Sequence, residues 1–273
     1  MKNYRYIRIA LALLSFAAIN CAFIDISGWG MRHCGWLAQW QLVPAVLSLN
    51  FFALAAILLI TYLGGRHYCS YICPLGIFQD IMARCGHRTP KKQPYSPAPE
   101  YRKLRLITLI VFIALAVCGF LNIACLLDPY GMYGRIAAEI FSPLYSQGNN
   151  WLAYQAASQD SYAFASVPLR PHSLIVLTVA VLSLIGITAT AWLQGRLYCN
   201  AVCPVGTFLG LISSHSLCRV RLNEEKCVSC KMCERVCKSG CIDISAKTID
   251  NSRCVVCGRC WQTCKVEGIR YGK

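Results

Sequence analysis

The chain has 273 residues, of which 56% are hydrophobic and 14% are charged, and its formal net charge is +15. A soluble fold of this size carries charges on roughly a quarter of its residues, so the composition excludes an ordinary soluble protein. The 11% aromatic content excludes a disordered chain. Nineteen cysteines, an odd number spread through a long chain, exclude a small disulfide-bonded scaffold. The composition instead predicts a metalloprotein embedded in a membrane.

Four apolar stretches are long enough to cross a bilayer, which takes about 20 helical residues. They are Ile9–Ile26, Val43–Leu63, Leu106–Leu127 and Leu174–Leu193. The only charged residue within them is Asp25, near the end of the first stretch. One such stretch could be the buried helix of a soluble protein. Four of them in a chain of this length predict a mostly α-helical, polytopic membrane protein with four transmembrane helices.

The first stretch has a second interpretation as a signal peptide, because the basic residues Lys2, Arg5 and Arg8 precede or begin it. Lipoprotein cleavage before Cys21 would need a small residue at the preceding position, and Asn20 fits poorly. We therefore expect this stretch to remain as a membrane span.

The basic residues predict the orientation of the spans. Of the 27 Lys and Arg residues, 24 lie before or at the start of the first span, between residues 64 and 105, or after residue 193. Basic residues mark the cytoplasmic side of a membrane. We expect a multi-pass protein of the bacterial inner membrane, with both termini and the C-terminal domain in the cytoplasm. Contact with anionic lipid accounts for the positive charge, and no aromatic-interleaved basic stripe indicates a nucleic-acid partner.

The connections between the spans differ in character. Residues 27–42 form a short outer loop with three tryptophans, which is typical of the aromatic belt at a membrane interface. Residues 86–103 form a Pro-rich basic linker, which we expect to lie on anionic headgroups. Residues 128–172 form a longer outer loop, for which we expect one short interfacial helix at 134–141 and no separate domain.

The tail of the chain contains a duplicated cysteine pattern. Two copies of C-x2-C-x2-C-x3-C occur at an offset of 27: Cys227, Cys230, Cys233 and Cys237, then Cys254, Cys257, Cys260 and Cys264. This spacing lets three thiolates from one loop bind a [4Fe–4S] cluster while the fourth comes from the other copy. We therefore expect one cluster on Cys227, Cys230, Cys233 and Cys264, and a second on Cys254, Cys257, Cys260 and Cys237. Residues 218–273 are predicted to form a small two-cluster ferredoxin-like α+β domain.

Zinc is the main alternative in the tail, because paired C-x2-C motifs also form four-cysteine zinc sites. Three cysteines at two successive two-residue gaps, twice over, favour iron–sulfur clusters. Lys238 and Lys265 stand where proline usually follows the fourth cysteine in bacterial ferredoxins. Cys241 aligns with Gly268 in the repeat, so we interpret it as a buried packing residue rather than a ninth ligand.

A second repeat follows the second and fourth spans. The segment Gly65–Phe78 recurs as Gly195–Phe208, at an offset of 130. Each copy contains the pattern C-x3-C-P, with the cysteines Cys69, Cys73, Cys199 and Cys203. Residues 1–217 therefore look like a duplicated two-helix unit. The proline after each second cysteine suits the first turn of a new helix, and we expect short amphipathic helices at Leu75–Cys85 and Val205–His215.

The four C-x3-C-P thiols are expected to hold a third [4Fe–4S] cluster. Two loops related by the duplication would bring two thiols from each half to a shared axis, and soft thiolates suit iron–sulfur. A redox-active thiol pair or another metal is the alternative. Arg66 and Arg196 occur at equivalent positions in the two copies. They either offset the charge of the cofactor or serve as snorkelling anchors at the interface.

Other candidate residues carry less information. We expect packing roles for the cysteines outside the motifs, Cys21, Cys34, Cys118 and Cys125. A Cys34–Cys125 disulfide or an outer metal site is the alternative. The five histidines show no paired ligand spacing, so no haem is expected. Asp25 and Asp128, at outer span ends, are interpreted as polar caps rather than proton-transfer groups.

Four spans, two C-x3-C-P motifs after the second and fourth of them, and a two-cluster ferredoxin tail resemble the NapH-type membrane iron–sulfur proteins. The NosR and CcoG groups share these motifs, but we find neither a periplasmic flavin-binding domain nor an immunoglobulin-like tail in this sequence. The resemblance implies a protein of the lipid bilayer that oxidises quinol or relays electrons for a redox enzyme. It implies a quinone and a redox protein as partners, and it does not identify the enzyme served.

The leading functional hypothesis is single-electron transfer, through [4Fe–4S] clusters, between the quinone pool or a membrane partner and other redox proteins. On this hypothesis the chain is an electron-transfer subunit of a quinol dehydrogenase type rather than a stand-alone enzyme, and no catalytic residue is assigned. The alternative is a metal- or thiol-handling maturation factor that uses the C-x3-C-P cysteines. A redox sensor or an anchor for a soluble partner is a third hypothesis.

Overall fold

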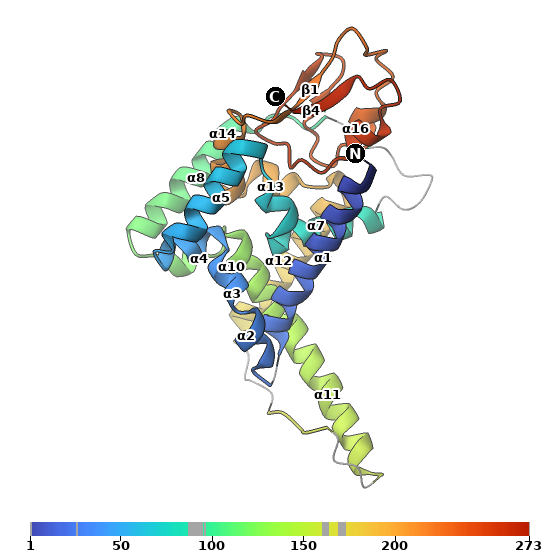
Figure 1. Cartoon of the computed structure of the whole chain (residues 1–273). Coiled ribbons are helices and arrows are strands. Elements are labelled where there is room, and N and C mark those ends of the chain that lie inside the picture. Colours follow the sequence, from blue (N-terminus) through green and yellow to red (C-terminus); the bar gives the residue numbers. More distant parts are fainter. Residues whose placement is uncertain are drawn as a thin grey trace.

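The structure is a computed structural model that describes residues 2–25, 27–86, 95, 97–159, 164–168 and 173–272. A bundle of helices makes up most of it, and a small module of short strands and helices lies at one end (Figure 1). The start of the first helix lies beside this module, whereas α11 projects from the opposite end of the bundle (Figure 1).

The chain is built mainly from short and medium-length helices. The bundle contains α1 (Lys2–Ile24), α2 (Trp29–Cys34), α3 (Trp36–Gln39), α4 (Leu42–Leu47), α5 (Phe51–Gly64), α6 (Tyr68–Tyr71), α7 (Pro74–Gly86), α8 (Arg102–Val117), α9 (Leu121–Ala124), α10 (Pro129–Ile136), the π-helix η1 (Ala137–Phe141), α11 (Ser142–Ala157), α12 (Leu174–Gln194), α13 (Leu197–Ala201) and α14 (Pro204–Ser213). The module contains β1 (Arg219–Leu222), α15 (Met232–Arg235), β2 (Ile242–Asp243), β3 (Thr248–Ile249), α16 (Arg259–Thr263) and β4 (Ile269–Gly272).

Two helices are long and apolar enough to cross a membrane, namely Tyr4–Ile24 within α1 and the whole of α12. Many of their apolar side chains face outward, and Leu14 and Leu182 are each about two-thirds exposed. A large exposed apolar surface of this kind marks contact with a partner or with lipid. The two helices therefore support association of the protein with a membrane.

The other two expected spans are not continuous helices. The stretch Val43–Leu63 divides into α4 and α5, because the backbone turns at Leu49, where φ is +54°, and the Asn50 side chain then caps α5. The stretch Leu106–Leu127 divides into α8 and α9 at Gly119, where φ is +82°. The prediction of four single spanning helices is therefore not confirmed. Hydropathy alone does not reveal helix caps and left-handed turns inside an apolar stretch.

The segment after the third stretch is more ordered than its composition predicts. Residues 129–157 form α10, η1 and α11 in succession, where the sequence indicated only one short helix at 134–141. Pro129 begins α10, and Asp128 caps it by accepting a hydrogen bond from the Gly131 N–H at 2.7 Å. Pro143 lies in the first turn of α11, where its missing N–H costs least. Well-placed caps and prolines thus outweigh the loop-like content of Gly, Ser and Asn.

The two short helices expected after the C-x3-C-P motifs are present as α7 and α14, close to the predicted bounds. They are not surface helices, however. Leu75, Phe78 and Gln79 on α7 and Leu209 on α14 are buried in the centre of the bundle. The apolar residues of α7 pack inside the protein, where α7 lies against α12.

The C-terminal module consists of two small antiparallel sheets around a core of its own. Strand β1 pairs with β4, and β2 pairs with β3. Trp261 stacks on Tyr271 with 5.5 Å between the ring centroids, and Tyr4 of α1 donates to the Val256 carbonyl at 2.9 Å. Tyr271 in turn donates to the carbonyl of Gly64, at the end of α5, at 2.8 Å. These contacts fix the module against the ends of α1 and α5.

The Pro-rich linker at 86–103 is only partly described, because residues 87–94 and 96 lie outside the described residues. Its described part contacts the module. The N–H of Tyr95 donates to the Arg235 carbonyl, and the N–H of Ala98 donates to the Gly240 carbonyl, both at 3.1 Å. Arg253 donates to the Ala98 carbonyl at 2.8 Å. This part of the linker is therefore paired with protein, where the sequence predicted contact with headgroups.

Candidate metal centres

The two C-x3-C-P motifs meet at the centre of the bundle. In each copy the first cysteine lies on a short helix, α6 or α13, and the second directly precedes α7 or α14. All four side chains are at most 3% exposed and belong to one hydrophobic core cluster: Cys69, Cys73, Cys199 and Cys203. The duplicated halves thus bring two thiols each to a shared buried site.

The local sequence explains how each loop presents its cysteines. Pro204 begins α14, and the Gly206 N–H donates to the Cys203 sulfur at 3.2 Å, which places that sulfur at the positive end of the helix. A Cβ atom on Gly206 would lie 2.4 Å from the Cys199 carbonyl oxygen. The equivalent Gly76 has its own close approach, 2.5 Å, to the Cys69 carbonyl. Only glycine allows these turns to close.

Arg66 and Arg196 are fully buried, so the snorkelling interpretation does not describe them. Each arginine reaches the cysteine loop of the opposite copy. Arg66 donates to the Cys199 carbonyl at 3.2 Å and to the Asn200 side chain at 3.0 Å. Arg196 donates to the Cys69 carbonyl at 2.8 Å. The two guanidinium groups therefore connect the halves and put positive charge beside the four sulfurs.

The donor set fits an iron–sulfur cluster. Burial raises the pKa of the thiols of Cys73, Cys199 and Cys203. Four buried thiolates are therefore favourable only if a cationic centre binds them, and soft thiolates suit iron. Arg66 Nε and Arg196 Nη2 are buried without a hydrogen-bond partner. Such donors would be satisfied by an anionic cluster with sulfide acceptors.

The tail cysteines surround two separate cavities in the module. One cavity is lined by Cys227, Cys230, Cys233 and Cys264. The other is lined by Cys237, Cys254, Cys257 and Cys260. Each cavity thus has three cysteines from one tail motif and a fourth from the other, which is the grouping expected from the spacing. Within the part of the chain that the structure describes, no three His, Cys, Asp or Glu side chains lie close enough together to hold a single metal ion. The thiols ring a space of the kind that a polynuclear cluster requires.

The two tail loops also share their backbone conformation. Ser229 and its repeat partner Val256 both have positive φ, +54° and +48°. Lys231 and its partner Gly258 do as well, at +56° and +81°. Non-glycine residues rarely adopt this conformation. Successive turns of this kind direct backbone N–H groups inward, where they can stabilise a bound anion.

Cys241 lies closer to the second tail cavity than the packing interpretation suggested. It is buried as expected, but it lines that cavity, and its sulfur lies 3.5 Å from the Cys237 sulfur. Lys238 is also buried and forms an ion pair with Asp80 of α7, whereas Lys265 is exposed. One of the two lysines that replace proline thus joins the module to the bundle.

Hydrogen bonds connect the central cysteine loops directly to the second tail set. Ser70, next to Cys69, donates to the Val255 carbonyl at 2.6 Å. Asn200, next to Cys199, donates to the Ser239 carbonyl at 3.0 Å. Val255 follows Cys254, and Ser239 lies two residues after Cys237. Each half of the central site is therefore joined to the backbone beside a cysteine of the second tail set, Cys237, Cys254, Cys257 and Cys260.

Sequence reasoning missed four side chains at these sites: Ser70, Gln79, Asp80 and Asn200. Gln79 donates to the Cys199 sulfur at 3.2 Å. The carboxylate of Asp80 contacts Arg8 at 3.3 Å and Arg196 at 2.6 Å, in addition to Lys238. The available signal was the asymmetry of the repeat, because Gln79 and Asp80 align with Leu209 and Gly210. Polar residues in only one copy of an apolar repeat indicate a specific contact.

Several of the remaining cysteines and aspartates make local contacts. Cys34 contacts Cys21 rather than Cys125, and all three are free thiols. Asp25 accepts a hydrogen bond from the Gly30 N–H at 2.7 Å. Asp25 and Asp128 both cap the turns that follow them, as the sequence predicted. Burial raises the pKa of Asp128 to about 6.

Comparisons with known proteins agree with this geometry. A family model described as a 4Fe-4S binding domain matches residues 47–93 and 176–223, which contain the two C-x3-C-P motifs. A second model with the same description matches residues 220–243, which contain the first tail motif. The chain thus contains ferredoxin-type 4Fe-4S binding domains, and iron–sulfur clusters are the cofactors that these domains support. No solved structure matches the chain.

Several curated proteins are similar over most of this chain. The methylamine utilization ferredoxin-type protein MauN of Paracoccus denitrificans is 29% identical over 74% of this chain and 56% of its own length. The putative electron transport protein YccM of Escherichia coli K12 is 23% identical over 78% of this chain and 54% of its own. An uncharacterized protein of Methanocaldococcus jannaschii is 23% identical over 78% and 67%. The chain spans about half the length of MauN and YccM.

Proposed function

We propose that the protein is a membrane-bound electron-transfer protein that passes single electrons between a quinone or a membrane partner and a redox protein. Three [4Fe–4S] clusters carry the electrons. The central cluster binds Cys69, Cys73, Cys199 and Cys203. The first tail cluster binds Cys227, Cys230, Cys233 and Cys264, and the second binds Cys237, Cys254, Cys257 and Cys260. When bound, each cluster supplies a centre that accepts and releases one electron.

One observation carries this proposal: the central cysteine loops are hydrogen-bonded to the backbone beside the cysteines of the second tail set. The links run from Cys69 through Ser70 to the Val255 carbonyl, and from Cys199 through Asn200 to the Ser239 carbonyl. They provide short covalent and hydrogen-bonded connections between two cysteine sets. Arg66 and Arg196 offset the negative charge of the central thiolates, and the burial of these thiolates excludes water.

An apolar cavity beside the central site suits a lipophilic electron carrier. Its volume is about 380 Å³, and its walls come from α8, α10, α12 and α13. Tyr198, which directly precedes Cys199, forms part of the wall together with Leu104, Ile187 and Val202. A quinone ring in this cavity would lie next to a residue adjoining the cluster ligands. Most small-molecule sites are likewise apolar cavities with few polar groups.

We further propose that the chain is a NapH-type subunit rather than a stand-alone enzyme. The ordered motif set supports this assignment, and MauN and YccM are named as ferredoxin-type and electron-transport proteins. The distribution of basic residues supports a multi-pass arrangement in the inner membrane with the module in the cytoplasm. A redox protein would then exchange electrons with the first tail cluster, whose Cys230 is exposed.

The thiol-handling alternative is less compatible with the central site. Thiol exchange and metal delivery need a thiolate that a client can reach. The four central thiols are each at most 3% exposed, and arginines and helix termini surround them. Copper bound at these thiols in a protein with intact tail clusters would support this alternative.

Reoxidation kinetics test the proposed path. The anaerobically purified chain is reduced with dithionite and mixed with a lipophilic quinone, and the tail clusters are followed by EPR. In the Cys69→Ser/Cys199→Ser variant, dithionite should still reduce the tail clusters, but the quinone should reoxidise them at least tenfold more slowly than in the wild type. The Cys34→Ser/Cys118→Ser variant removes two cysteines outside the motifs and should behave as the wild type. Equal rates in all three proteins would exclude the central site from the path.

A further inference from the structure

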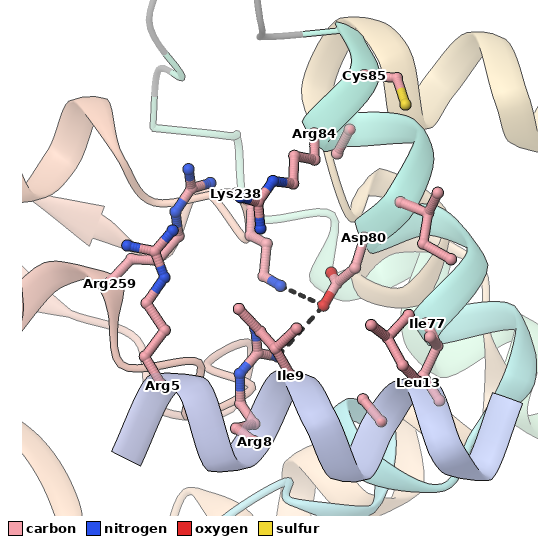
Figure 2. Close-up of a pocket in the computed structure, with 13 residues that line it drawn as sticks. Arg5, Arg8, Ile9, Leu13, Ile77, Asp80, Arg84, Cys85, Lys238 and Arg259 are labelled. Carbon is pink, nitrogen blue, oxygen red and sulfur yellow. Dashed lines mark hydrogen bonds and ion pairs between the residues drawn. The ribbon is translucent and has the colours of Figure 1, made fainter. Parts of the chain in front are cut away.

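A basic cavity lies between α1, α7 and the ferredoxin module (Figure 2). Its volume is about 250 Å³. Five basic residues and one acidic residue line it: Arg5, Arg8, Arg84, Lys238, Arg259 and Asp80. In Figure 2 the head groups of Arg5, Arg84, Lys238 and Arg259 gather on one side of the cavity, away from the apolar side chains of α1 and α7. The cavity is distinct from the central cysteine site, and it shares the wall residue Arg259 with the second tail cavity.

Asp80 does not neutralise this charge. Its carboxylate already contacts Arg196 at 2.6 Å, Arg8 at 3.3 Å and Lys238. Burial alone would raise the pKa of Asp80, but the charges of Arg196 and Lys238 hold it well below its usual range. Asp80 therefore stays ionised and is a poor proton acceptor, which disfavours a quinol as the occupant. The lining keeps a formal excess of four positive charges.

Several of the basic groups have no counter-charge. The positive charges of Arg8, Arg84 and Arg259 lie close enough to Arg5 to repel it. Among the described residues, Arg5, Arg84 and Arg259 form no ion pair with an acidic side chain. Arg8 is 5% exposed, and its Nε atom has no hydrogen-bond partner. Arg84 is exposed and Arg5 and Arg259 are half-buried, so water screens part of their mutual repulsion. A phosphate group would relieve the rest, because it accepts hydrogen bonds from several arginines at once.

The remaining walls of the cavity are apolar. They consist mainly of Ile9, Ala12 and Leu13 on α1 with Ile77 and Ile81 on α7. The α1 residues belong to a helix that is long and apolar enough to span a membrane, and Leu13 is about half exposed. The apolar wall thus continues onto a surface suited to lipid. The occupant should therefore combine an anionic head with an apolar chain.

We propose that this cavity binds an anionic phospholipid, with its phosphate among Arg5, Arg8, Arg84 and Arg259 and an acyl chain along Ile9 and Leu13. Lys238 and Arg259 directly adjoin Cys237 and Cys260 of the second tail set. The lipid would therefore hold the module against the bundle next to that cluster. Free phosphate shares the chemistry of the head group but not that of the chain.

Binding of spin-labelled phosphatidylglycerol to the full-length protein in neutral detergent tests this site. We expect saturable binding of one lipid per chain, at least tenfold tighter than that of spin-labelled phosphatidylcholine. Millimolar inorganic phosphate or glycerol phosphate should not displace the lipid. Displacement by either compound would identify an oxyanion site and overturn the assignment to a lipid. Equal binding of the two lipids would overturn the proposal altogether.

Two charge-matched variants separate the cavity from general surface charge. Arg5→Gln/Arg84→Gln removes two cavity arginines that do not adjoin a cysteine ligand. Arg102→Gln/Arg270→Gln removes two exposed arginines outside the cavity, so both variants carry the same net charge. The cavity variant should bind phosphatidylglycerol no better than phosphatidylcholine, with unchanged iron content, whereas the control should bind as the wild type. Equal weakening in both variants would show that the attraction is non-specific.

Discussion

Asp80 is one of the residues that join the ferredoxin module to the helical bundle. Its single carboxylate is shared by Arg8 of α1, Arg196 of the second repeat and Lys238 of the module. Three segments far apart in the sequence thus depend on one carboxylate that is only 16% exposed. Removal of one partner from a buried ion network leaves uncompensated charges, which is more costly than the net value of the network itself.

We expect Asp80→Asn to destabilise the module by roughly 3 kcal/mol, because three cations would lose their common counter-charge. The measurement is the midpoint of thermal loss of cluster absorbance under anaerobic conditions. Glu224→Gln is the matched control, since Glu224 pairs with Lys247 at 3.0 Å while both side chains are more than half exposed. An exposed pair contributes about 0–1 kcal/mol. Equal midpoints for the two variants would contradict the role given to Asp80.

The raised pKa of Asp128 should make the stability of the folded protein depend on pH. Its pKa is raised from 3.8 to about 6 in the folded protein by burial. Between these values the folded state binds more protons than the unfolded state, so stability falls as the pH rises from about 4 through about 6. At pH 8 the wild type therefore carries a buried charge that costs about 2–3 kcal/mol.

We expect Asp128→Asn to be more stable than the wild type at pH 8, because Asn keeps the cap on α10 without the charge. The difference should shrink toward pH 5, as Asp128 becomes protonated. Thermal unfolding followed by circular dichroism in detergent between pH 5 and 8 measures both. A difference that is constant across this range would show that Asp128 does not titrate there.

At the scale of residues, the spacing predicted the cysteines and the duplication pointed to Arg66 and Arg196, but neither identified the partners of the other polar side chains at the sites. The tail repeat implies the same two cysteine sets that line the two cavities, because ligand spacing reflects the local geometry of a loop. Ser70, Asp80 and Asn200 act across more than 30 residues of sequence, on partners that only the folded chain brings near. A single sequence carries no record of such pairs.

At the scale of elements, glycine determines how the cysteine loops close. Gly76 and Gly206 each lie against a cysteine carbonyl in their own repeat, and an added methyl group would approach it within 2.5 Å. These glycines lie in the first turn of α7 and of α14, the helices that begin directly after the second cysteine of each motif. The sequence motif C-P-x-G therefore encodes a close approach of two backbone segments.

We expect Gly206→Ala to displace the start of α14 and to lower the iron content by about four atoms per chain, the equivalent of one cluster. The tail clusters should keep their EPR signals. Gly148→Ala is the control, because Gly148 lies on α11 with no atom within 4 Å of an added Cβ. This control should keep full iron and be at least as stable as the wild type, because alanine favours a helix more than glycine does. Full iron in Gly206→Ala would contradict the close-approach argument.

The prediction that Val43–Leu63 and Leu106–Leu127 are each one continuous helix was wrong, because hydropathy does not show where a helix is interrupted. Apolar residues fill both Val43–Leu63 and Leu106–Leu127, so hydropathy treats each as uniform. Asn50 and Gly119 interrupt them, one as a cap and the other as a left-handed turn. The motif tyrosines contact the ends of these stretches rather than the interruptions. Tyr68 accepts a hydrogen bond from the Leu42 N–H at 3.1 Å, and Tyr198 donates one to the Leu127 carbonyl at 2.9 Å.

At the scale of the whole molecule, the proposal requires the module and both termini to lie on one side of the membrane. We expect reporter fusions at residues 95 and 273 to give cytoplasmic signals, and fusions at residues 35 and 155 to give signals from the outside. The physical reason is the concentration of basic residues at the module end of the bundle. A fusion at residue 273 that reports the outside would overturn the orientation and place the clusters away from cytoplasmic redox partners.

The central claim is that the two halves of the bundle share one cluster, in addition to the two in the tail. Iron and acid-labile sulfide, counted per chain in anaerobically purified protein, test this claim most directly. We expect about twelve irons in the wild type, as three clusters of four, and about eight in Cys69→Ser/Cys199→Ser. A wild type that already stops at about eight irons, with the tail signals intact, would mean that the four central thiols hold no cluster.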